Sequence, residues 1–126
     1  MELKDQVVSP ELAQKLKELG VRQAYFQWVG KEIWDKGMQS EYETPATPPR
    51  SSWTSAFTVA ELREMLPDHV DTKQWQYDLS CWKEDDGWRI HYGRIGQLYE
   101  QLEAPTEADA RAKMLIYLLE NKLITL

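Results

Sequence analysis

Residues 106–126, TEADARAKMLIYLLENKLITL, decide the fold, because they combine a helix start, a helix end and a long apolar segment. Thr106 is a typical N-cap, Asp109 stands at the N3 position of a box-like arrangement, and Asn121 fits the C′ position. Residues 114–119 are apolar without interruption, so apolar side chains extend beyond the single stripe of a plain amphipathic helix. We therefore expect other elements, the long loop or a second subunit to cover this helix together with the sheet.

Two shorter helices precede it. The first is predicted from residue 10 to residue 19, with Ser9 as N-cap, Pro10 at the first helical position and Gly20 in the left-handed conformation past the end. The second begins at Thr58, which forms a capping box with Glu61, and a proline ends it. Both helices carry leucines at helical spacing, so each has one face to bury.

Residues 24–34 predict a β-hairpin between these two helices. Apolar and polar residues alternate on both sides of Gly30-Lys31, a pair that suits a two-residue turn. In this register Trp28 faces Ile33, which gives the hairpin an apolar cross-strand pair.

Residues 75–82 and 88–92 also alternate and predict two strands, and residues 98–103 suggest a further one. The turn between the first two allows two registers, a tight Asp86-Gly87 turn or a four-residue loop. Both registers place the same apolar side chains on one face, namely Leu79, Cys81, Trp88, Ile90 and Tyr92.

Residues 37–56 are rich in Pro, Ser and Thr and predict a long loop, which Trp53 and Phe57 anchor to the body. The chain length fits a single domain. The predicted fold class is α+β, an antiparallel sheet of four to five strands with three helices packed mainly on one face.

Composition limits the setting of the protein. The formal net charge is −6, and an acidic surface disfavours binding to nucleic acid. Cys81 is the single cysteine, which fits a reducing compartment. The longest apolar run is six residues, against about 20 for a membrane span, and the N-terminus lacks the apolar region of a signal peptide. We expect a cytoplasmic protein that makes no membrane contact.

No catalytic pattern is recognisable in the sequence. Cys81 falls on the apolar side of its strand, where a thiol is usually a small buried hydrophobe. His69 and His91 are the two histidines, too few and too far apart for a structural zinc site. No glycine-rich phosphate loop is present. We expect neither a metal nor a cofactor, and we favour a protein that is not an enzyme.

Aromatic residues outside the predicted core are the strongest candidates for binding. Trp34, Tyr42, Trp53 and Trp82 fall on loops or on outward strand positions. Exposed large aromatics beside a long loop can form a protein-binding surface, unless the loop folds back and covers them. The alternative is a cleft between the loop and the sheet that uses Arg89, His91 and Asp78 for a small ligand or a reaction.

Four segments carry a resemblance to a known family, and together they span most of the chain. They read SPELAQKLKELGV, YFQWV, SAFTVAELREMLP and EADARAKMLIYLLENKLI. On these segments the chain resembles a family of small bacterial and phage-borne proteins without an assigned role. The resemblance implies a bacterial or prophage setting, and it implies no activity and no functional residue.

The sequence therefore predicts a non-enzymatic bacterial or prophage accessory protein that contacts another protein through the aromatic surface. A possible homodimer through the C-terminal helix is part of this prediction.

Overall fold

The computed structural model describes residues 2–21, 24–35, 38 and 42–125. Three α-helices and two antiparallel sheets make up the described part, with short 3-10 turns at Leu3–Asp5 and Arg50–Ser52. The predicted α+β class is confirmed, but the strands divide into two sheets. The elements are α1 (Pro10–Glu18), β1 (Gln27–Val29), β2 (Glu32–Trp34), β3 (Thr54–Ser55), α3 (Val59–Met65), β4 (His69–Asp71), β5 (Gln76–Glu84), β6 (Gly87–Arg94), β7 (Gln97–Ala104) and α4 (Glu107–Glu120).

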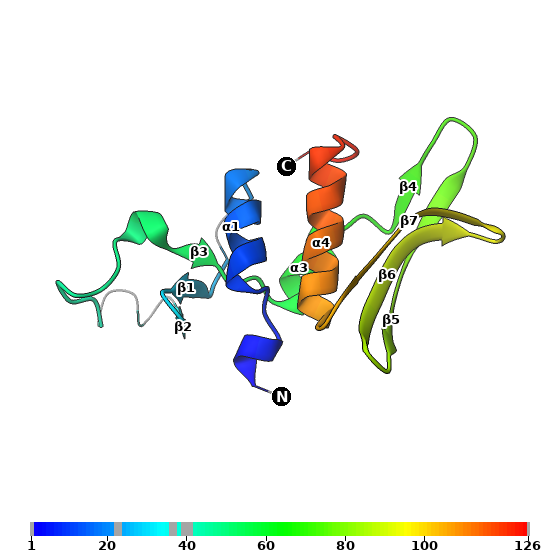
Figure 1. The fold of residues 1–126 in the computed structure, drawn as a ribbon. Coiled ribbons are helices and arrows are strands. Elements are labelled where there is room, and N and C mark those ends of the chain that lie inside the picture. The colour runs from blue at the N-terminus through cyan, green and yellow to red at the C-terminus, as the bar shows by residue number, and fades with distance from the viewer. Residues whose placement is uncertain (1, 22–23, 36–37, 39–41, 126) are drawn as a thin grey trace.

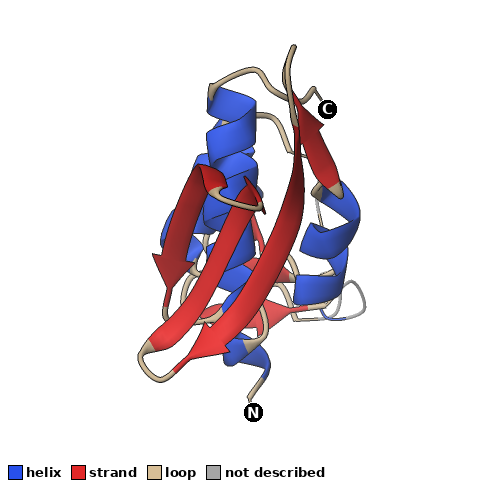
Figure 2. Ribbon diagram, turned by 90° about the vertical axis from the view of Figure 1, so that its right-hand side faces the viewer, coloured by secondary structure: helices blue, strands red, loops and turns tan. Residues whose placement is uncertain are grey.

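The helices lie between the two sheets, as Figure 1 shows. The small sheet has the order β2-β1-β3, and the large sheet has the order β4-β5-β6-β7. Figure 2 looks onto the large sheet from its outer side, with the helices behind it. One face of the large sheet therefore packs on helices, while the other faces solvent.

Helix α4 is the centre of this arrangement. It contacts β6 and β7 on one side and α1 and α3 on the others. Met114, Leu115 and Leu118 are fully buried, as are the alanines of its first turns. Only Glu120 among its residues is exposed. Helices α1 and α3 of the same chain therefore cover the apolar surface of α4 that the sheet does not contact. Covering α4 does not require a second subunit.

The start of α4 differs from a capping box. The Thr106 hydroxyl accepts the N–H of Asp109 at 3.2 Å, as predicted. The Asp109 carboxylate, however, accepts the backbone N–H of Ser9 at 2.7 Å, far along the chain. Ser9 occupies the predicted N-cap position of α1, but its side chain makes no capping hydrogen bond. One carboxylate therefore links the starts of α1 and α4.

The end of α4 lies one residue later than predicted. Asn121 has a φ of −93°, and Lys122 takes the left-handed conformation with a φ of 57°. Asn121 is therefore the C-cap rather than the C′ residue, and its side-chain amide donates to the carbonyl of Tyr117 at 2.8 Å.

Two other predictions that depend on neighbouring residues are confirmed. The capping box of Thr58 and Glu61 is complete. Trp28 pairs with Ile33 across the first hairpin. In the β5–β6 hairpin Lys83 pairs with Trp88, which is the register of the four-residue loop. The pairing continues to Glu84 and Gly87, so Asp85 and Asp86 alone make the turn.

The long loop is partly regular. Residues 37 and 39–41 lie outside the described part of the chain. Trp53 and Phe57 are buried, as predicted for anchors. Between them, β3 pairs with β1, a strand that the sequence did not indicate. This pairing draws the end of the loop onto the first hairpin and creates the second sheet.

Candidate functional site

Trp34 and Trp53 are buried, so they do not belong to an exposed binding surface, and the alternative in which the loop folds back and covers them is the one that the structure shows. They are 7% and 6% exposed, and their rings meet edge to face with centroids 5.7 Å apart. The indole N–H of Trp53 donates to the carbonyl of Pro48 at 3.0 Å. The loop has folded back over the hairpin, and the two rings form a small core with Val29.

The other two aromatic candidates lie far from one another. Tyr42 is 57% exposed and borders an open pocket of about 370 Å³ with Glu32, Trp34 and Met38, beside the small sheet. Trp82 belongs to β5 in the large sheet, and the two sheets lie at opposite ends of the molecule (Figure 1). The four aromatic residues therefore do not form one surface.

Trp82 and His91 do contact each other on the outer face of the large sheet. Their ring centroids are 4.9 Å apart, at an interplanar angle of 72°. The indole N–H of Trp82 donates to Glu84 at 2.8 Å. The Nδ1 atom of His91 is buried and has no hydrogen-bond partner among the described residues. Among the described residues, this nitrogen is the one buried side-chain polar atom without a hydrogen bond.

Arg89 lies nearby but in a different pocket. Its guanidinium bonds Asp86 at 3.0 Å and Glu103 at 3.1 Å. The adjoining pocket of about 260 Å³ is lined by these three residues with Ala104, Pro105 and Lys113, and neither His91 nor Asp78 contributes to it. The predicted cleft that combines Arg89 with His91 and Asp78 is therefore not formed.

The described residues give little support to a nucleophilic site or a metal site. Burial raises the pKa of the Cys81 thiol, which opposes formation of the reactive thiolate. His69 lies 3.6 Å from Asp71 on strand β4, and both side chains are exposed. Across the described residues, no group of His, Cys, Asp or Glu side chains is arranged to hold a metal ion. No helix in this part of the chain has the length and apolarity to cross a membrane.

A pocket of about 460 Å³ lies where α3 and α4 begin. Arg63, Thr58 and Trp88 help to line it, together with Glu107. The Glu107 carboxylate accepts from Arg63 at 3.3 Å and from Arg111 at 2.8 Å. The position that an anionic ligand would take beside these arginines is therefore already filled by Glu107.

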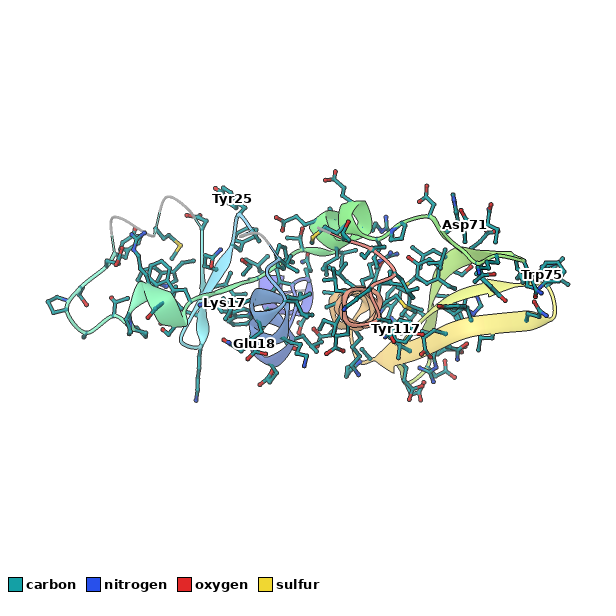
Figure 3. The ribbon with its side chains drawn as sticks, turned by 90° about the horizontal axis from the view of Figure 1, so that it is seen from above. Lys17, Glu18, Tyr25, Asp71, Trp75 and Tyr117 are labelled. Carbon is teal, nitrogen blue, oxygen red and sulfur yellow. The ribbon has the colours of Figure 1, made fainter. Side chains whose placement is uncertain are left out.

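The far end of the large sheet exposes large apolar side chains that sequence reasoning did not single out. Ile95 is fully exposed (101%), Leu98 is 56% exposed and Trp75 is 42% exposed. The β4–β5 loop and the β6–β7 turn meet at this end, where the Arg94 guanidinium lies 3.7 Å from the centroid of the Trp75 ring. Figure 3 shows Trp75 at the end of the sheet away from the helices. We call Trp75, Ile95 and Leu98 the apolar tip.

The one sequence signal for the apolar tip is the isoleucine in the turn Ile95-Gly96. Turn positions usually carry Gly, Pro, Asn, Asp or Ser. Trp75 instead follows the alternation of Tyr77 and Leu79, which places it on the helix-facing side of the sheet. Alternation identifies that side, but it does not show that the helices end before they reach this residue.

A second apolar surface lies between α1, α4 and β7. An open groove of about 500 Å³ has Leu12, Leu102, Ile116 and Tyr117 as its apolar lining, and Glu11, Lys15, Lys113 and Glu120 as its charged rim. Figure 3 shows Tyr117 beside α4 on the same side of the molecule as Glu18 of α1. We call this surface the β7 groove.

The chain matches no protein-family model, no curated protein and no solved structure. The resemblance to bacterial and phage-borne proteins therefore stays a prediction.

Proposed function

We propose that this chain is a non-enzymatic interaction protein that contacts a partner protein through the apolar tip. The observation that carries the proposal is the fully exposed Ile95. Gly96 supplies the positive φ of 77° in this turn, so the fold needs no isoleucine beside it. Burying one such side chain in a partner is worth about 1.5–3 kcal/mol.

Leu98 and Trp75 extend the contact around Ile95. The indole of Trp75 is held against the Arg94 guanidinium, which gives a flat and preorganised surface of the kind found at binding hot spots. Arg94 and Lys73 also bring positive charge to this end of an acidic chain. The partner surface that fits is an apolar pocket with an acidic rim, because opposite charge steers association.

A bacterial or prophage accessory role is consistent with this proposal. The resemblance supports such a setting, and the net charge of −6 favours a protein partner over nucleic acid.

Affinity capture from a bacterial lysate, with quantitative mass spectrometry, tests the proposal. We expect wild type to retain a partner that Ile95→Ser and Leu98→Ser lose, because both changes remove apolar area without touching the core. Tyr42→Ser is the matched control, since Tyr42 is as exposed as Leu98 but lies beside the small sheet. Equal capture by wild type and Ile95→Ser contradicts the proposal. If only Tyr42→Ser loses the partner, the contact lies at the small sheet and not at the apolar tip.

A small-ligand or enzymatic site at His91, apart from the Arg89 pocket, is the second candidate. The observation in its favour is the buried Nδ1 atom of His91 without a hydrogen-bond partner. A fragment library screened by NMR should then shift the imidazole signals of His91, and His91→Phe should abolish binding. If no fragment moves these signals, the second candidate is rejected.

A further inference from the structure

Strand β7 ends the large sheet and offers a free edge. It spans eight residues, about 27 Å of extended chain, and pairs with β6 alone among the described strands. An edge strand presents backbone N–H and C=O groups that a further strand can pair with. Whether a further strand can pair here depends on which backbone groups of β7 point outward and on their present hydrogen-bond partners.

Two charged side chains occupy two of the outward groups. The carbonyl of Glu103 accepts from the Lys113 ammonium at 2.8 Å. The N–H of Gln101 donates to the Glu100 carboxylate at 3.0 Å. Antiparallel strands alternate in the direction of their hydrogen bonds, so residues 101 and 103 share the outward direction, and their neighbours face β6. The carbonyl of Ala104 accordingly lies against Gly87 of β6.

The β7 groove runs beside this edge on the helix side of the sheet. Leu102 belongs to both the strand and the groove, and Ile116 and Tyr117 of α4 continue the apolar lining. Lys15 and Lys113 balance Glu11 and Glu120, so the rim is neutral although the chain is acidic. An added strand would therefore place every second side chain into an apolar groove without strong charge repulsion.

We propose that the β7 edge binds the β7 edge of a second copy of this chain, antiparallel, with Leu102 on the twofold axis. In this register Gln101 stands opposite Glu103 of the second copy. Their outward N–H and C=O groups then hydrogen-bond to each other and replace the two charged side chains. The large sheets of the two copies become one continuous sheet, and the groove linings meet above it.

The displaced charges complement each other in this register. Glu100 stands opposite Ala104 of the second copy, next to Glu103, the residue whose carbonyl Lys113 releases. Glu100 and α4 lie on the same face of the sheet, since Glu100 pairs with the buried Tyr92. The released carboxylate of one copy therefore faces the released ammonium of the other, on both sides of the axis.

This self-complementarity singles out a second copy as the occupant. A twofold interface uses the same patch twice, so each group must find its complement in the same patch. Here Gln101 complements Glu103, Glu100 complements Lys113, and Leu102 meets itself. No carboxylate stands directly opposite another carboxylate.

Sedimentation equilibrium of the full chain tests the proposal, with an expected mass of twice 14.8 kDa. Lys113→Glu and Glu100→Lys should each weaken the dimer by roughly 10- to 100-fold, because each turns two symmetric ion pairs into repulsions. The double variant Glu100→Lys, Lys113→Glu should restore the dimer. Gln101→Pro should abolish it, since proline removes an outward N–H that β6 does not use.

Ile95→Ser is the matched control and should stay dimeric, so this proposal and the proposed function at the apolar tip can fail separately. Circular dichroism and thermal unfolding check that each variant is folded. A monomer at every concentration up to about 1 mM, equivalent to a binding free energy weaker than about 4 kcal/mol, overturns the proposal. A dimer that resists Gln101→Pro overturns it too, as does a double variant that stays monomeric.

Discussion

Replacing Asp109 by alanine should destabilise the fold by about 2–4 kcal/mol. Its carboxylate accepts the backbone N–H of Ser9 at 2.7 Å in a partly buried position. A hydrogen bond to a charged group contributes about 1.5–3 kcal/mol, and loss of a carboxylate from the first turn of α4 adds about 0.3–1 kcal/mol. The Ser9 N–H would also be left without its partner.

Ser9→Ala is the informative comparison. A serine at the N-cap usually contributes about 1 kcal/mol through its side chain. The hydroxyl of Ser9 makes no capping bond here, so we expect a change below about 0.5 kcal/mol. Thr58→Ala serves as the positive control, because the capping box of α3 is complete and its loss should cost about 1–2 kcal/mol.

Urea unfolding followed by tryptophan fluorescence and by circular dichroism gives these free energies by linear extrapolation. For a chain of this length Asp109→Ala should also lower the midpoint of thermal unfolding by roughly 10 °C. The reasoning is refuted if Ser9→Ala costs as much as Asp109→Ala, or if Asp109→Ala costs less than about 1 kcal/mol.

Three further predictions concern Tyr92, Cys81 and Gly87. Tyr92→Phe removes a hydroxyl that donates to the carbonyl of Pro67 at 2.7 Å, and urea unfolding should show a loss of about 1–2 kcal/mol. Burial raises the pKa of Tyr92 above its ordinary value of 10.0, so its contribution is fully present below about pH 10 and lost at higher pH. The stability of wild type should therefore fall more steeply in alkali than that of Tyr92→Phe. Cys81 should react with iodoacetamide at pH 8 at least about tenfold more slowly than a free thiol, and at the free rate in urea. Gly87→Ala should cost more than about 2 kcal/mol in thermal unfolding, because its Cβ would lie 2.7 Å from the carbonyl oxygen of Ala104 at a φ of +144°.

Much of the fold could be predicted because short-range chemistry decides it. The capping box of Thr58 and Glu61 closes over three residues, and the pairing of Trp28 with Ile33 follows from a two-residue turn. These interactions form between close neighbours in the chain, so residue type and spacing suffice to identify them.

The candidate site was predicted less well. The sequence left open whether Trp34 and Trp53 are exposed or covered by the long loop, and they bury each other once β3 pairs with β1. Trp75 follows the core alternation but extends past the helices and is exposed. In both cases residue type sets the tendency to be buried, and a distant segment decides whether anything covers the residue.

The sequence by itself determined that a central helix follows the Thr106 cap, observed as Glu107–Glu120, and that the chain belongs to the α+β class. Periodicity and capping are properties of neighbouring residues, and they survive in any arrangement of the elements. Tertiary structure alone decided that α1 and α3 cover this helix and that Asp109 binds Ser9. It also decided that the apolar tip is exposed and that β7 is left as an edge. Contacts between segments far apart in the chain depend on how whole elements pack, and no local pattern encodes them.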